Sequence, residues 1–125
     1  MNYFYTLFIS KSVNETENGF EVIVQCNPSH PVYQVHFPDN PITPGACLIQ
    51  TTSTLLEHKL GHKVWLRNIK YVKFLSSIIP VESKEVKFIF SPLTVAEKET
   101  KVQVVITDSL TICAKMSLVF SHDPL

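Results

Sequence analysis

The chain has 125 residues, with 11 Lys and Arg against 11 Asp and Glu, so its formal net charge is zero. This length predicts one domain over residues 1–125, and the balanced charge leaves no basic footprint for general nucleic-acid binding. Every apolar run is shorter than the roughly 18 residues that a membrane span needs. The apolar start, Met1–Ile9, lacks the basic segment and the cleavage site of a signal peptide, so we expect a first strand and a cytoplasmic protein.

Short runs of alternating apolar and polar residues dominate the chain and predict strands. Only one segment has the length and composition of a long helix. One helix on a largely antiparallel sheet defines an α+β domain. The expected order is β-β-α-β-β-β-β, with strands at about Tyr3–Val13, Phe20–Asn27, Val64–Leu75, Glu85–Phe90, Lys101–Thr107 and Leu110–Phe120, and the helix at Ala46–Leu60.

The predicted helix lies between two glycines, Gly45 at its start and Gly61 at its end. Gly61 occupies the usual place of a left-handed C-terminal cap. Because the helix is apolar over much of its circumference and has few charges before its final turns, we expect it to be buried and wrapped by the sheet. Five prolines between residues 28 and 44 stiffen the preceding loop, which suits a site that must be held in place.

This loop carries the most informative motif of the chain, His36-Phe37-Pro38-Asp39-Asn40-Pro41-Ile42-Thr43-Pro44-Gly45. The motif places an imidazole in a proline-braced loop shortly before a helix N-terminus. Backbone N–H groups and the dipole at such a terminus can stabilise a carbonyl oxygen that becomes negative. An imidazole nearby can remove a proton. The motif therefore favours proton abstraction next to a carbonyl group.

The motif resembles the active-site signature of the 3-hydroxyacyl-acyl-carrier-protein dehydratases with the hotdog fold, His-Phe-Pro-x-x-Pro-x-x-Pro-Gly before a long helix. The resemblance extends more loosely from Phe8 to Phe120. It implies an antiparallel sheet wrapped around one long central helix, with no metal or cofactor. It also implies a substrate carried on the phosphopantetheine of acyl carrier protein. The active unit would be a homodimer, or a trimer of dimers, in which the histidine and a catalytic carboxylate come from different subunits.

Carried over by position, His36 is the base and Gly45 the oxyanion donor, but Gln50 stands where the family has Glu or Asp. An amide forms hydrogen bonds but cannot donate a proton as a carboxylic acid does. Two routes keep the activity: protonated His36 returns its proton to the leaving hydroxyl while Gln50 orients it, or a water held by Gln50 relays the proton. Neither Glu57, too far along the helix, nor Asp39, at a variable motif position, is an expected replacement.

The substitution leaves three functions open. The first is a 3-hydroxyacyl-carrier-protein dehydratase of fatty-acid or polyene biosynthesis; dehydratase-like proteins of aryl-polyene and flexirubin-type pigment clusters look similar and also lack the usual acid. The second is a hotdog thioesterase, which needs a carboxylate or an equivalent base beside the reactive carbon. The third is a catalytically silent subunit that binds carrier protein or completes a heterodimer. The intact His36 and Gly45 favour the first.

The resemblance also directs attention to two sets of binding residues. Positive charge concentrates around the end of the helix and the next strand, which suits an acidic carrier protein, although a solvated strand face is the alternative. The acids that balance it, Glu15, Glu17, Glu97 and Glu99, are expected in turns elsewhere. We expect carrier-protein binding by Lys63, Arg67, Lys70 and Lys73, next to His58, Lys59 and His62, and an apolar substrate tunnel lined by Phe37, Pro44, Leu48, Val72 and Phe74.

The cysteines and the remaining histidines have no spacing typical of a metal site. Cys26, Cys47 and Cys113 are expected to be reduced, buried thiols. Cys47 lies in the first turn of the helix, where a thiol pKa can be lowered, so a nucleophilic role is its alternative. Surface or loop positions without metal are expected for His30, His58, His62 and His122.

Overall fold

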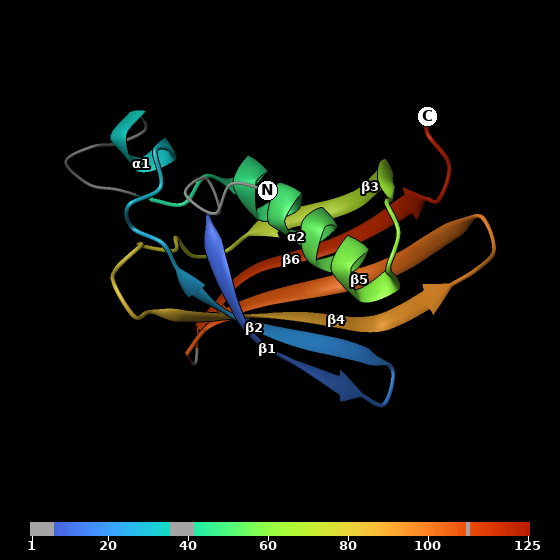
Figure 1. The fold of residues 1–125 in the computed structure, drawn as a ribbon, viewed down its shortest axis with the longest axis horizontal. Helices are drawn as coiled ribbons and strands as arrows, with labels where there is room; N and C mark the ends of the chain where they lie inside the picture. Colours follow the sequence, from blue (N-terminus) through green and yellow to red (C-terminus); the bar gives the residue numbers. More distant parts are fainter. Residues whose placement is uncertain (1–6, 36–41, 110) are drawn as a thin grey trace.

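The computed structural model describes residues 7–35, 42–109 and 111–125 (Figure 1). It contains the predicted strands and the predicted long helix, in the predicted order, and one additional short helix in the loop before the long one. The elements are β1 (Phe8–Thr16), β2 (Gly19–Cys26), α1 (Val32–Val35), α2 (Gly45–Leu60), β3 (Trp65–Phe74), β4 (Glu85–Val95), β5 (Glu99–Asp108) and β6 (Thr111–Ser121).

All strands belong to one antiparallel sheet in the order β1-β2-β4-β5-β6-β3. The strand that follows the long helix therefore crosses to the far side of the sheet, so that β1 and β3 form its two edges. Figure 1 shows α2 lying across one face of the curved sheet, with β3 behind its first turns. This confirms the predicted α+β class and the hotdog arrangement of one long helix on an antiparallel sheet.

The core lies between α2 and the concave face of the sheet. Residues on β2 and β5 alternate between buried and more exposed positions, as their sequence pattern predicts. Phe20 and Phe90 stack at 4.4 Å between ring centroids, and neither is exposed to solvent. Leu55 and Leu56 of the helix belong to the same hydrophobic core. Burial of these large apolar groups is the main force that holds the helix on the sheet.

In the single chain, α2 buries one face against the sheet. Its buried residues are Leu48, Thr52, Leu55 and Leu56, which share one face. Gln50 on the opposite face is exposed. In the middle turns, the hydroxyl groups of three threonines and one serine each donate a hydrogen bond to the carbonyl four residues earlier. These small polar side chains allow the helix to keep one side towards solvent although it carries few charges.

Several predicted strands are too short, because polar residues beyond their predicted ends also pair with the neighbouring strand. β1 runs to Thr16, which pairs with Gly19, so most of the polar stretch predicted as a turn is strand. β4 continues past Phe90 through a bulge to Val95. The start of the first predicted strand lies outside the described residues. No helix in the described ranges combines the length and the apolar character required to cross a membrane.

Gly19 supports the sheet in a way that can be tested. A Cβ built on it would lie 1.8 Å from the carbonyl oxygen of Phe90 on the neighbouring strand. Because that atom belongs to the backbone of β4, Gly19→Ala should lower the free energy of unfolding by about 3 kcal/mol, as overpacking does. Urea denaturation of the purified variant measures the loss.

Gly61 provides the control, since a Cβ there meets no atom within 4 Å but the backbone has φ of +80°. Gly61→Ala should cost only about 1 kcal/mol, the strain of a left-handed residue. Equal stability of Gly19→Ala and the wild type would show that β2 and β4 approach less closely than described.

Candidate functional site

The first turn of α2 has no side-chain cap. Pro44 occupies the N-cap position, and it offers no side-chain hydrogen-bond acceptor. The first bonds of the helix are donated by the N–H groups of Cys47 and Leu48 to the Pro44 carbonyl, at 3.0 and 3.3 Å. The N–H groups of Gly45 and Ala46 precede these bonds and donate to no backbone carbonyl of the described residues, so they and the positive end of the helix dipole could stabilise an oxygen that carries negative charge.

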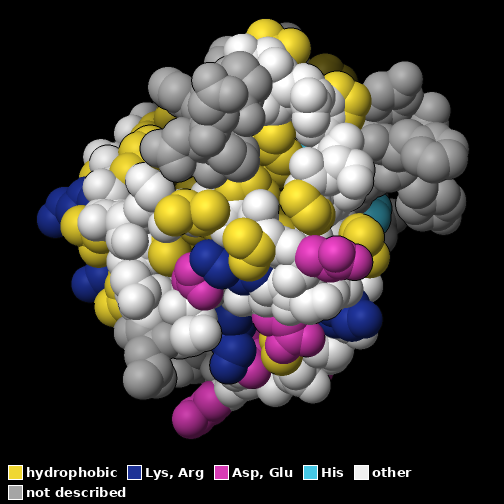
Figure 2. All heavy atoms as spheres, turned by 90° about the vertical axis from the view of Figure 1, so that its left-hand side faces the viewer, with side chains coloured by type: hydrophobic (Ala, Val, Ile, Leu, Met, Phe, Trp, Pro, Cys, Tyr) yellow, Lys and Arg dark blue, Asp and Glu magenta, His cyan; other side chains and the backbone are white. Residues whose placement is uncertain are grey.

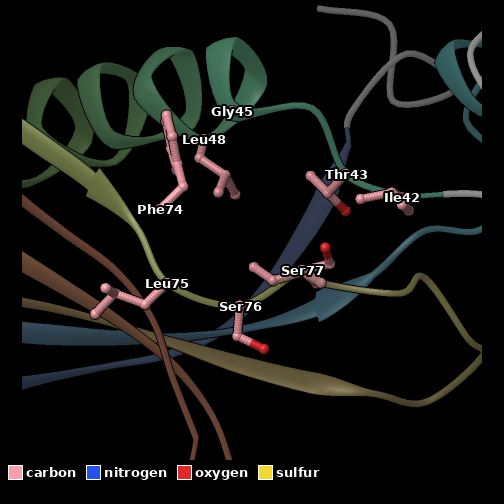
Figure 3. Close-up of a pocket in the computed structure, with 9 residues that line it drawn as sticks. Ile42, Thr43, Gly45, Leu48, Phe74, Leu75, Ser76 and Ser77 are labelled. Atoms are coloured by element: carbon pink, nitrogen blue, oxygen red, sulfur yellow. The ribbon is translucent and has the colours of Figure 1, made fainter.

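This turn opens onto a cavity of about 320 Å³ between α2, the end of β3 and the segment that follows β3 (Figure 3). Its walls combine large apolar side chains with three hydroxyl groups, the mixture usual for small-molecule sites. Figure 2 faces this end of the molecule and shows apolar side chains gathered across its middle, with charged side chains below them. The cavity is lined by Ile42, Thr43, Gly45, Leu48, Phe74, Leu75, Ser76, Ser77 and Ile78.

Backbone hydrogen bonds fix the segment after β3 as one side of the cavity. The N–H groups of Leu75 and Ser76 both donate to the Cys113 carbonyl, at 2.8 and 3.2 Å, so the chain stays attached to β6 after the ladder ends. Ile78 is fully buried, and its carbonyl accepts the Thr43 N–H at 2.9 Å. The segment therefore joins the sheet to the residues that lead into α2.

A buried hydrogen bond ties α1 to the entry of α2. The Tyr33 hydroxyl and Thr43 Oγ1 lie 2.9 Å apart, and the two residues are 3% and 5% exposed. Burial raises the pKa of the Tyr33 hydroxyl, which therefore stays protonated. The sequence did not predict α1 or this bond. A tyrosine three residues before the motif and a threonine within it are too common to signal a contact.

The structure brings together three of the predicted substrate and catalytic residues. Gly45, Leu48 and Phe74 line the same cavity. Pro44 is the N-cap beside it, whereas Val72 lies earlier on β3 and packs partly buried against the core. His36 and Phe37, the predicted base and a predicted tunnel residue, lie outside the described residues.

Gln50 does not share a face with this cavity. It follows Leu48 by two residues, which turns it about 200° around the helix axis. Leu48 is buried at the cavity wall, and Gln50 is exposed to solvent. Within a single chain, Gln50 and the cavity wall at Leu48 therefore face different sides of α2.

Glu57 and Cys47 have no catalytic position in this arrangement. One carboxylate oxygen of Glu57 accepts the Val64 N–H at 3.0 Å, which secures the connection from α2 to β3. Burial raises the pKa of the Cys47 thiol and so opposes formation of the thiolate. Cys26 and Cys113 are buried as expected, whereas Cys47 is only partly buried. Among the described residues, no group of three or more His, Cys, Asp or Glu side chains could hold a metal ion.

The basic surface near β3 is partly neutralised, which corrects one expectation. Arg67 Nη1 lies 3.1 Å from Glu99 Oε1, and Lys59 pairs with Glu15, so two acids expected elsewhere lie beside the patch. The sheet order explains Arg67, because β6 brings the start of β5 close to the start of β3. One further cation was not predicted for this surface: Lys115 on β6 lies directly opposite Lys73 on β3. Lys63, Lys70, Lys73 and Lys115 are the exposed lysines of this region.

The Tyr33–Thr43 bond gives a stability prediction. Tyr33→Phe should lower the free energy of unfolding by about 1–3 kcal/mol, because it leaves the buried Thr43 hydroxyl without its partner. Adding Thr43→Val should recover most of this loss, since both polar groups are then absent. Urea denaturation of the two single variants and the double variant measures the coupling. Additive losses would mean that the two hydroxyls do not interact.

Comparisons with known proteins agree with this architecture. The ApeI-like family, described as ApeI dehydratase, matches residues 12–115. No match was found among curated proteins. The dehydratase heterocomplex ApeI:P from Xenorhabdus doucetiae superposes with a TM-score of 0.70 at 14% identity, over 91% of this chain and 97% of that one.

Two thioesterase structures share the fold at similarly low sequence identity. A hypothetical thioesterase protein with coenzyme A from Streptococcus pneumoniae gives a TM-score of 0.60 at 13% identity, over 91% of this chain and 86% of that one. A mutant thioesterase from Pseudomonas aeruginosa gives 0.61 at 8% identity, over 94% and 82%. At these identities the structures establish the hotdog fold, and the family match is more specific. The chain belongs to the ApeI-like dehydratase family.

Proposed function

We propose that this protein is a 3-hydroxyacyl-carrier-protein dehydratase, which removes water from a 3-hydroxyacyl thioester to give the trans-2-enoyl thioester. The observation that carries the proposal is the uncapped first turn of α2 at a cavity with apolar walls. A hydrogen bond from the Gly45 N–H to the thioester carbonyl oxygen would stabilise the oxyanion that develops on it. The α-proton of the thioester would therefore become more acidic. Membership of a dehydratase family supports the same reaction.

The reaction needs a base, an oxyanion donor and a path for the leaving hydroxyl. In our proposal His36 takes the α-proton, and the electron pair of that C–H bond forms the new double bond as the C–O bond at the β-carbon breaks. The imidazolium of His36 then returns its proton to the departing hydroxyl, which leaves as water. Gln50 orients that hydroxyl or holds a relaying water, since its amide cannot supply a proton.

We further propose that the active unit contains two chains. Gln50 points away from the cavity of its own chain, so it can serve a site only across an interface. β3 offers such an interface, since it is an edge strand with exposed apolar side chains at Ile69 and Tyr71. A homodimer, or a trimer of such dimers, would combine the cavity of one chain with Gln50 of the other.

The substrate would arrive on the phosphopantetheine of acyl carrier protein, with no other cofactor. Lys63, Lys70 and Lys73 are exposed, and among the described residues no carboxylate pairs with them. Arg67 belongs to the same strand but also binds Glu99. These cations, with Lys115, would attract an acidic carrier protein to the side of the molecule on which β3 leads to the cavity.

One competing function follows from a specific observation. The exposed amide at Gln50 leaves the chain without the acid of the 3-hydroxyacyl-acyl-carrier-protein dehydratases that its motif resembles, and the structurally similar ApeI:P dehydratase is a heterocomplex. In this alternative, the chain is a catalytically silent subunit that needs a different partner chain for activity. Product masses separate the possibilities: loss of water from a 3-hydroxyacyl carrier-protein thioester identifies a dehydratase, free acid a thioesterase, and unchanged substrate a silent subunit.

His36→Ala should reduce dehydration at least about 10²-fold, because the variant has no general base. The measurement is the rate of enoyl thioester formation by the purified protein. His58→Ala is the matched control, since His58 is an exposed histidine on α2 and should leave the rate unchanged. Full activity of His36→Ala would remove His36 from the mechanism.

Gln50→Glu should dehydrate the substrate as fast as the wild type or faster, by up to about 10²-fold, because a carboxylic acid can protonate the leaving hydroxyl. The exposed position makes the change neutral for folding. Gln50→Ala should be slower than both, since it removes the orienting amide. A Gln50→Ala variant with the wild-type rate would show that residue 50 does not reach the reacting atoms.

A further inference from the structure

The space beside the helix-opening glycine is filled by an aromatic ring. A Cβ built on Gly45 would lie 2.5 Å from Cζ of Phe74, 2.8 Å from Cε2 and 3.0 Å from Cε1. Gly45 does not have a positive φ, so its backbone conformation is open to any residue. The contact with the tip of the Phe74 ring is therefore what favours glycine here. Figure 3 shows the same arrangement, with Phe74 reaching from the end of β3 to the first turn of α2.

The ring is held weakly compared with the other apolar walls. Phe74 is 53% exposed, is the last residue of an edge strand, and lies opposite the small Ala114 on β6. Leu48 and Ile78 are 3% and 1% exposed and belong to the core, so they cannot move without opening it. A half-exposed side chain at the end of a strand changes rotamer within nanoseconds. Phe74 is thus the wall residue that can move while the fold stays intact.

We propose that Phe74 is a specificity-determining residue, whose ring is a movable wall that sets how much acyl chain the cavity accepts beside Gly45. The inference rests on the proposed function, because it places the thioester carbonyl on the Gly45 N–H. Gly45 and Phe74 line one cavity, so an acyl group bound at that N–H shares its space with the ring. A short chain fits beside the ring in its present position, whereas a long chain requires the ring to turn outward.

Other wall residues do not fit this role. Leu75 is also exposed, but Figure 3 shows its side chain pointing away from Gly45. Thr43 is fixed by its bond to Tyr33 and by its N–H bond to Ile78. A change in the size of residue 74 is therefore the most direct way to change the free space beside the first turn of α2.

The test compares two substrates, the N-acetylcysteamine thioesters of 3-hydroxybutyrate and 3-hydroxydecanoate. Phe74→Ala should raise the ratio of kcat/KM for the long over the short substrate by about tenfold, the range that a few methylene contacts provide. Phe74→Leu should give a smaller rise, and it preserves an apolar side chain should the alanine variant fold poorly. Ile79→Ala is the matched control, since Ile79 is a similarly exposed residue of the same connecting segment and should leave the ratio unchanged.

A stability cycle tests the contact itself without catalysis. Gly45→Ala should lower Tm less in the Phe74→Ala background than in the wild type, because the ring that its methyl group meets is absent. Equal shifts in both backgrounds would overturn the contact and the inference.

The catalytic outcomes separate the two proposals. An active wild type whose substrate ratio is unchanged in both residue-74 variants overturns the role of Phe74 and leaves the dehydratase function intact. A wild type that dehydrates neither thioester, nor a carrier-protein thioester, overturns the proposed function and the inference with it.

Discussion

The packing of one face of α2 against the concave sheet determines where the site lies. Leu48, Leu55 and Leu56 bury that face, and the aromatic layer beneath them fixes the position of the helix along the strands. Because this packing places the first turn at the end of β3, the N–H groups of that turn lie beside Phe74 and the segment that follows it. The proposed oxyanion site would thus be a consequence of the core, and it would need no charged side chain.

The entry to the helix is held by neutral, buried groups. Tyr33 and Thr43 share a hydrogen bond, and the backbone of Thr43 is joined to Ile78. Pro44 then begins the helix without a side-chain cap, so within the described part of the chain the first N–H groups have no capping side chain, at the cost of about 1 kcal/mol that a Ser or Asp cap would supply. Loss of a stabilising cap at an otherwise well-ordered helix is expected where a terminus serves a ligand.

The sequence predicted the order of strands and helix because their periodicities are strong and local. The buried alternation of β2 and the glycines at either end of α2 are examples. What could not be predicted depends on sheet order: Arg67 meets Glu99, and Lys115 meets Lys73, only because β6 lies between β5 and β3. The same holds for the site, where the motif identified Gly45 but the contact that favours glycine comes from residue 74.

The position of Gln50 connects the chemistry to the assembly. An acid at this place would have to be desolvated and aimed at the leaving group, yet in the single chain residue 50 faces solvent, about 200° around the helix from the cavity wall at Leu48. A neutral amide is less costly than a carboxylate to bury when a second chain covers it. In the proposed dimer, the substitution would exchange proton donation for an interface that is easier to close, and the base would be the only titratable group that the proposed reaction requires. Such a site would depend on the imidazole for both proton transfers.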